Sequence, residues 1–341
     1  MKVRMYNVGF GDCFCLRDRK KSLLVDFGTN NSRIEGRPRR EIFDVIISDL
    51  STIKRKNLLL TPGIYDLEEP IVVNRPDTIV LGMGLATLRA AKGNVCLETG
   101  DVQGLILAGL LFDAGETKSD NLLVVGSEDQ KSEDNGKNIY LSDLFFRVGG
   151  TDTDTPVSVK CCATINSSHV VGDNFWVWRA DHGDNVAWEE NKAENGIIIN
   201  GDEVTMYALM VEHFEQYQTV WNGDHGKVYM YQSEIPYDVP TQEVWMSHEG
   251  QKNGYASFYV DGAVDAFEAW GLGVYLYNRD ASVELDTAME VPDKNGVKVH
   301  NICTVMLTGY PGMNHIINES GDSVTFAGER KVICEYENGL I

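Results

Sequence analysis

The sequence predicts an all-β protein built as a parallel β-helix. Short apolar segments recur at intervals of 24 or 25 residues, as between Val204 and Val228 and between Val299 and Val324. Repeats of this length are typical of stacked architectures, because one unit cannot bury its apolar face alone. The chain is also rich in glycine, in β-branched residues and in Asn-Gly or Asp-Gly pairs, which favours strands joined by turns.

Departures from the regular interval indicate insertions. The earlier intervals, of 31 or 34 residues up to Val204, fit one turn plus an inserted loop. Residues 127–137 and 149–155 are polar, turn-rich stretches that fit such loops. The interval of 46 residues between Val228 and Val274 indicates about two turns, although residues 241–269 also have the character of an excursion.

The first part of the chain differs in charge from the rest. Residues 1–56 hold 13 basic and 7 acidic residues, whereas the remainder holds 17 and 44. Such asymmetry predicts a boundary. We therefore expect an N-terminal β-hairpin segment at 1–56, with its turn at 17–21, and a β-helix domain at 57–341.

Composition limits the classes of partner. A net charge of −21 argues against nucleic acid or an anionic membrane surface as a partner, and no apolar run is long enough for a transmembrane helix. Seven cysteines with no CxxC spacing indicate buried free thiols. The N-terminus lacks the apolar core of a secretion signal, so the chain as written is expected to be cytoplasmic. The oligomeric state is left open.

A charged residue follows the start of most strands at nearly the same offset. These residues are Asp113, Arg147, Arg179, Glu212 and Glu234. Equal offsets on adjacent coils of a solenoid lie about 4.8 Å apart. The sequence therefore predicts a ladder of ionisable side chains along one edge, with Asp181, His182 and His213 beside it.

This ladder predicts a carbohydrate site with paired carboxylates. Glycoside hydrolysis needs one carboxyl group to protonate the leaving oxygen and another to activate water or attack carbon. We expect Asp181, Glu212 and Glu234 to supply these groups. Tryptophans suit sugar rings, which need a flat apolar platform. Trp178 and Trp221 are expected to stack on sugars, and His182 and His213 to contact substrate.

Arg179 is expected to bind a substrate oxygen or to keep one carboxylate ionised. A further acidic pair, Asp202-Glu203, follows Asp181 by 21 residues, a spacing similar to that of polygalacturonases, and adds Asp202 to the catalytic candidates. No metal ligand set is predicted. Ca²⁺ bound by Asp-rich loops is kept as a possibility for lyase chemistry.

Four short sequence segments resemble those of a known protein family. They are WRADHG at 178–183, VEHF at 211–214, YQSEIPYD at 231–238 and AWGLGVY at 269–275. Residues from about 58 to 326 resemble bacterial glycoside-hydrolase-like right-handed β-helix proteins of the coagulation factor 5/8-type-domain and pectate-lyase groups. The resemblance implies a right-handed helix, a carbohydrate-directed function and relatives that are usually secreted.

The N-terminal segment resembles a different group. The words NVGFGD at 7–12 and LLVDFG at 23–28 are similar to the opening of metallo-β-lactamase-fold hydrolases. That family next carries an HxHxDH metal motif, which is missing here. The segment is therefore expected to be a truncated start without a catalytic residue.

Four functional readings remain open from the sequence. A glycoside hydrolase acting on a polysaccharide or oligosaccharide is favoured, and a polysaccharide lyase is its enzymatic variant. A non-catalytic glycan-binding or structural β-helix is the third reading. A recombined product whose N-terminal segment precedes an idle solenoid is the fourth. The glycan, its linkage, the stereochemistry and exo or endo action are not predicted.

Overall fold

A computed structural model describes residues 57–128, 136–151 and 155–341 in full. Within residues 1–56 it describes only the backbone of short strands, at 2–7, 12–18, 21–25, 33–34, 37–38 and 56. There β2 (Asp12–Asp18) and β3 (Lys21–Val25) pair antiparallel around the predicted turn. The division at residue 56 stays a prediction, because most of what surrounds it lies outside the described residues.

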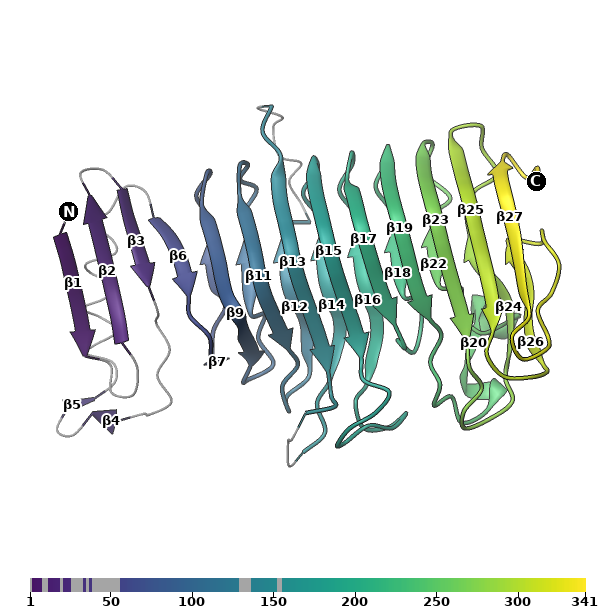
Figure 1. Cartoon of the computed structure of the whole chain (residues 1–341), viewed down its shortest axis with the longest axis horizontal. Helices are drawn as coiled ribbons and strands as arrows, with labels where there is room; N and C mark the ends of the chain where they lie inside the picture. Colours follow the sequence, from purple (N-terminus) through teal and green to yellow (C-terminus); the bar gives the residue numbers. More distant parts are fainter. Residues whose placement is uncertain are drawn as a thin grey trace.

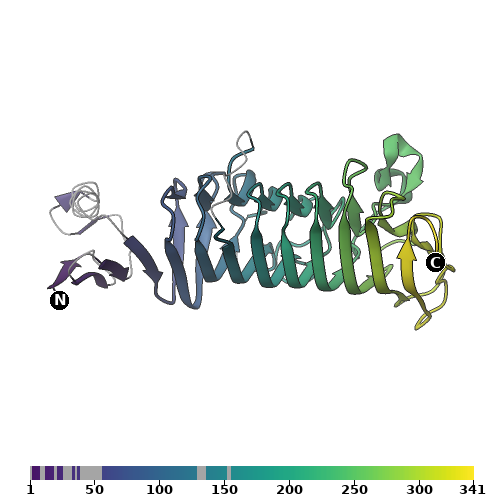
Figure 2. The same ribbon diagram turned by 90° about the horizontal axis from the view of Figure 1, so that it is seen from above.

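The chain coils into a parallel β-helix whose turns stack along one axis (Figures 1 and 2). Each coil contributes one long strand to a large sheet and one short strand to a small sheet. Because crossovers between parallel strands are right-handed, the solenoid is right-handed. No described residue belongs to an α-helix, and the described part of the chain offers no helical segment suited to crossing a membrane.

The large sheet runs through β1 (Lys2–Asn7), β2, β3, β6 (Lys56–Leu60), β9 (Ile79–Ala90), β11 (Ile106–Asp113), β13 (Ile139–Val148), β15 (Val170–Arg179), β17 (Thr205–Glu212), β19 (Gly226–Glu234), β23 (Phe267–Leu276), β25 (Val297–Met306) and β27 (Arg330–Glu337), with β7 (Ile64–Leu67) beside β9. The small sheet runs through β8 (Ile71–Val73), β10 (Leu97–Thr99), β12 (Ser119–Val125), β14 (Val159–Ile165), β16 (Ala193–Ile199), β18 (Thr219–Trp221), β22 (Phe258–Val260), β24 (Glu284–Glu290) and β26 (Gly312–Ile317). Outside both sheets lie β4 (Arg33–Ile34) with β5 (Arg37–Pro38), and β20 (Met246–Ser247) with β21 (Lys252–Asn253).

Seven long strands of the large sheet, from β11 to β25, each bend at one left-handed residue. These residues are Gly109, Asp143, Asn174, Ala208, Met230, Gly271 and Asn301. Glycine, asparagine and aspartate tolerate a positive φ best, so five of the seven bends suit their residue. Register resumes directly after the bend, as at Leu110 opposite Leu144. The ends of successive long strands therefore come together at one edge, where the site described below is built.

The core fills the space between the two sheets. Phe112, Phe146 and Phe175 stack on successive coils, with ring centroids 4.9 and 6.2 Å apart. Trp221 belongs to this core: it is fully buried, packs against Phe258 and donates its indole N–H to a backbone carbonyl. The prediction that Trp221 stacks on a sugar is wrong, because its position on β18 points inward.

The interval of 46 residues between Val228 and Val274 contains one coil, not the two that the sequence predicts. Between Glu234 and Phe267, β22 is the single strand of the small sheet. The extra length is an excursion containing β20, β21 and the 3-10 turns Gln242–Val244 and His248–Gly250. It projects from the side of the solenoid, in green (Figure 2).

The C-terminal end closes with a reversal of direction. Val324 starts no further coil, since it forms only an isolated bridge to Met313. Instead β27 runs antiparallel to β25 and covers its edge. The last strand of the large sheet is then β27, whose charged residues Arg330, Lys331, Glu335 and Glu337 disfavour pairing with another chain.

The prediction of buried free thiols is confirmed for three of the five cysteines that the structure describes, and is wrong for Cys334. Cys96, Cys161 and Cys162 are buried free thiols, whereas Cys303 is half-buried and Cys334 exposed. Cys13 and Cys15 have side chains outside the described residues.

Candidate active site

Successive long strands align acidic and aromatic side chains at one edge of the large sheet. Glu212 at the end of β17 lies opposite Glu234 at the end of β19, and opposite Trp178 on β15. Arg147 and Asp113 continue the same row on the preceding coils. The ladder predicted from the sequence is thus present in these residues, with one exception.

The exception is Arg179, which lies one residue beyond the row. It aligns with Val148, whereas Trp178 aligns with Arg147 and Glu212. Because strand side chains alternate between faces, a shift of one residue turns the guanidinium inward. Its predicted place in the outward ladder is wrong.

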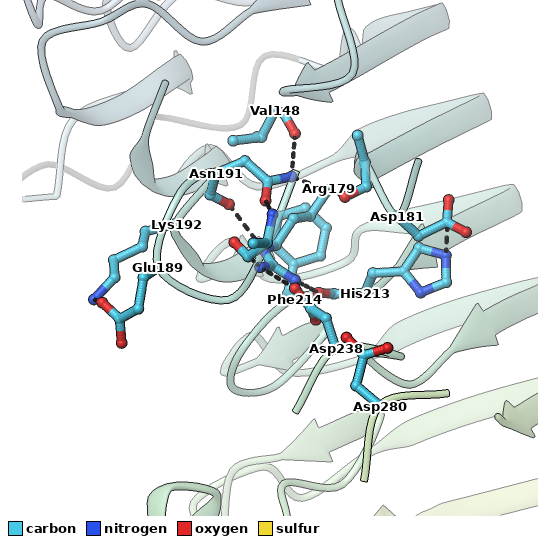
Figure 3. A network of polar contacts seen from close by, with 12 residues as sticks. Val148, Arg179, Asp181, Glu189, Asn191, Lys192, His213, Phe214, Asp238 and Asp280 are labelled. Atoms are coloured by element: carbon cyan, nitrogen blue, oxygen red, sulfur yellow. Dashed lines mark hydrogen bonds and ion pairs between the residues drawn. The ribbon is translucent and has the colours of Figure 1, made fainter. Parts of the chain in front are cut away.

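The guanidinium of Arg179 is 1% exposed and all five of its N–H groups are used (Figure 3). Two donate to the carboxylate of Asp238, at 2.9 and 2.7 Å. The others donate to backbone carbonyls of Ala187, Asn191 and His213. Arg179 therefore does not reach a substrate oxygen, and the carboxylate it keeps ionised is Asp238, not a catalytic candidate.

Asp181 and Glu234 lie beside the buried imidazole of His213, and Glu212 lies opposite Glu234 on the adjacent coil. We call these three side chains the carboxylate cluster. His213 Nε2 lies 3.8 Å from Asp181 and 3.9 Å from Glu234. The side chains of Asp181 and Glu234 are 21% and 27% exposed, so solvent and ligands can reach them. The sequence prediction that these acids meet is confirmed, although their roles are not thereby tested.

Burial keeps His213 neutral. It is the largest influence on the imidazole and lowers its pKa to about 4, although Asp181 acts in the opposite direction. Nδ1 lies 3.4 Å from the carbonyl oxygen of Ile235. The ring is also packed edge-on against Tyr237, with centroids 4.4 Å apart. His213 is thus a buried support beneath the carboxylates and, at 3% exposure, presents little surface to a substrate.

The surroundings of Glu234 keep its carboxyl group protonated up to nearly neutral pH. Burial, followed by the negative charges of Glu212 and Asp181, raises its pKa to about 7. Gln232 donates to its Oε1 at 3.2 Å, and Tyr237 donates its hydroxyl to Oε2.

Glu212 has a different environment from its neighbour. Burial raises its pKa, but hydrogen bonds from Trp176 and Gln232 oppose that rise. The indole N–H of Trp176 donates to Glu212 Oε2 at 2.8 Å. Glu212 and Glu234, on adjacent coils, therefore differ in pKa because their surroundings differ. Glu234 is the one that binds a proton more strongly.

Asp181 remains ionised. Burial is the largest single influence and would raise its pKa, but the imidazoles of His213 and His182 outweigh it and lower the value. His182 Nδ1 lies 2.8 Å from Asp181 Oδ1. Its ring contacts Trp178, which in turn stacks on Trp176 with centroids 5.3 Å apart. Substrate contacts by Trp178 and by the exposed His182 stay predictions.

Asp202 does not join the carboxylate cluster. It lies in the turn before β17, whereas Glu212 ends that strand. The two residues therefore lie at opposite ends of an eight-residue strand that bends at Ala208. Asp202 Oδ1 instead accepts the backbone N–H of Asp224. The 21 residues between Asp181 and Asp202 are fewer than the 34 of one coil here, which brings Trp178 opposite Glu212, so the two aspartates do not stack.

Comparison with known proteins decides the family. The model of the LAM55 pectate lyase-like domain matches residues 45–234, a stretch that contains the whole carboxylate cluster. The chain belongs to the LAM55 pectate lyase-like family. Its parallel β-helix is the fold that this family name describes.

A curated relative is the exo-beta-1,3-glucanase of Streptomyces sp. (strain SirexAA-E / ActE), 40% identical over 267 residues, which are 78% of this chain and 43% of that protein. Two solved structures of sacteLam55A from Streptomyces sp. SirexAA-E cover 98% of this chain at TM-scores of 0.80 and 0.81, with 31% and 32% identity. One of these is a variant in complex with glucose. This LAM55 chain spans 62% of each solved chain and 43% of the curated relative.

Sequence reasoning missed four groups in this LAM55 site. Trp176, Gln232 and Tyr237 contact the carboxylates, and Asp238 fixes Arg179. Gln232 could have been found, because it precedes Glu234 by two residues and must share its face. Tyr237 and Asp238 follow in a connection whose path no periodicity predicts.

Among the fully described residues of this LAM55 chain, no set of three His, Cys, Asp or Glu side chains has the arrangement of a metal site. Parts of the loops at 127–137 and 149–155 lie outside those residues, so Ca²⁺ at such loops stays a prediction.

Proposed function

We propose that this chain carries both the acid and the base or nucleophile of a glycoside hydrolase site that acts on a β-1,3-linked glucan. The observation that carries the proposal is the pairing of Glu212 with Glu234 on adjacent coils in surroundings that separate their proton affinities. The substrate is inferred from the relative, an exo-beta-1,3-glucanase, and from the glucose complex of a solved family member.

In this mechanism Glu234 is the general acid. Its raised pKa keeps the carboxyl group protonated near neutral pH, so that it can protonate the leaving glycosidic oxygen. Glu212, whose hydrogen bonds from Trp176 and Gln232 limit the rise in its pKa that burial causes, serves as the base or nucleophile. Trp178 provides the platform on which a sugar ring stacks beside both groups.

The products formed from a glycan distinguish a hydrolase from a lyase and from a non-catalytic β-helix. A lyase yields a new double bond that absorbs in the ultraviolet and needs a cation beside its substrate. Arg179 cannot be that cation, because its guanidinium is buried and fully paired. A non-catalytic β-helix would bind glucan and release nothing. Hydrolysis would release reducing sugar without ultraviolet absorbance.

We expect the purified chain to release reducing sugar from β-1,3-glucan oligosaccharides, with kcat/KM falling as pH rises through about 7. The sign follows from the acid role, because the proton needed by the leaving oxygen is lost above the pKa of Glu234, about 7. Chromatography of products across a pH series measures both. Glucan binding with no product would favour the non-catalytic reading, and undiminished turnover up to about pH 9 would remove Glu234 as the acid.

A further inference from the structure

The indole N–H of Trp176 donates a hydrogen bond to Glu212, and the proposed reaction gives this bond no role. We propose that Trp176 is a positioning residue whose indole N–H orients Glu212 and keeps its carboxylate ionised. This inference rests on the proposed function in one respect, since Glu212 is there the base or nucleophile. The contact itself is a property of the fold and can be tested without turnover.

The contact arises from a diagonal between neighbouring coils. Trp176 on β15 aligns with Met210 on β17, and Glu212 lies two residues further along β17 on the same outer face. Diagonal neighbours in a sheet are about 7–8 Å apart, within reach of an aromatic side chain. The indole crosses this gap and places Nε1 at 2.8 Å from Glu212 Oε2.

The chemistry of the donor selects one protonation state. An indole N–H can donate but cannot accept, so it offers nothing to a carboxylic O–H. A hydrogen bond to a charged acceptor is roughly twice as strong as one between neutral groups. The bond is therefore strongest when Glu212 is ionised.

The ring is held in place from one side. Trp176 and Trp178 stack with an interplanar angle of 20° and centroids 5.3 Å apart, and Trp178 contacts His182. Trp176 nevertheless remains 41% exposed. Replacement of this exposed ring by another aromatic ring should therefore leave the core unchanged.

Other groups around Glu212 act mostly against ionisation. Asp181, in the loop after β15, is ionised and raises the pKa of Glu212, whereas Glu234, which faces Glu212 from β19, holds its proton up to about pH 7. His213, next along the chain, is neutral, and Tyr231 is buried beneath the sheet. Gln232 and Trp176 are the neighbours whose hydrogen bonds lower the pKa of Glu212. Loss of the indole donor should therefore raise that pKa.

The test is Trp176→Phe, which keeps a ring and removes the donor. We expect kcat/KM at about pH 4.5 to fall about tenfold relative to the unchanged chain, and to stay within about threefold at about pH 6.5, because only the ionisation of Glu212 is affected. Trp270→Phe is the matched control. Trp270 lies on the same outer face but stacks between Tyr229 and His300, so its profile should match that of the unchanged chain.

A second readout is independent of catalysis. Carbon-13 labelling of glutamate carboxyl groups, with Glu212→Gln to assign the signal, follows the titration of Glu212 by NMR. We expect its midpoint to move to higher pH in Trp176→Phe and to stay in place in Trp270→Phe. An unchanged midpoint in Trp176→Phe would overturn the inference. A moved midpoint in a chain that cleaves no glucan would support it while removing the proposed function.

Discussion

Glu234→Gln is expected to lower kcat for β-1,3-glucan about 10²–10⁴-fold, the usual contribution of a general acid. The amide has the size of the acid and can keep the contacts with Gln232 and Tyr237, so the fold should persist. What it loses is the proton that burial and the neighbouring carboxylates hold on Glu234 up to about pH 7. Initial rates of reducing-sugar release, with circular dichroism as the check on folding, measure the effect.

A substrate with an acidic phenol as leaving group distinguishes the acid role from general damage. Such a phenolate departs without a proton, so Glu234→Gln should retain far more activity on it than on glucan. Asp202→Asn is the matched control, since Asp202 lies at the other end of β17 and should leave both activities unchanged. Equal losses on the two substrates would contradict the assignment of Glu234.

Arg179→Met is expected to lower the free energy of unfolding by about 3–5 kcal/mol, the usual cost of removing one partner of a buried ion pair. Asp238 would remain buried, at 5% exposure, without its cation. The backbone carbonyls of Ala187, Asn191 and His213 would also lose their donor. Urea unfolding followed by tryptophan fluorescence gives the change.

The control is Arg89→Met, which removes an exposed ion pair. Arg89 lies 2.6 Å from Asp66, and the two side chains are 35% and 55% exposed, so the expected cost is about 1 kcal/mol or less. Arg179→Met combined with Asp238→Asn should cost less than Arg179→Met alone, because no unpaired charge remains. Equal costs for the two arginine variants would show that the buried network does not fix the loops behind the carboxylate cluster.

The sequence predicted the parallel β-helix and the meeting of Asp181, Glu212 and Glu234, because both follow from a repeat whose equal offsets become neighbours in space. It misplaced Arg179 because the offset counted there was nine residues, whereas the row of Glu212 follows an offset of eight. A slip of one residue reverses the face of a strand.

Other site residues could not be placed from the sequence, because their contacts do not follow from the repeat. Trp221 looked suitable for a sugar by residue type, but the inward side of β18 decides its burial. Asp202 follows Asp181 by 21 residues, fewer than the 34 of this coil, and so lies at the other end of its strand. Trp176 reaches Glu212 on a diagonal, and Asp238 reaches Arg179 from a connection after β19. These pairings require the path of the loops.

The account rests on a glucan chain lying across the edge where β15, β17 and β19 end. A crystal structure of Glu234→Gln with a β-1,3-glucan oligosaccharide tests this most directly. We predict a sugar ring on Trp178, with a glycosidic oxygen within hydrogen-bonding distance of residue 234 and the adjoining anomeric carbon facing Glu212. An oligosaccharide bound elsewhere on the solenoid, with this edge filled only by water, would contradict the proposed site.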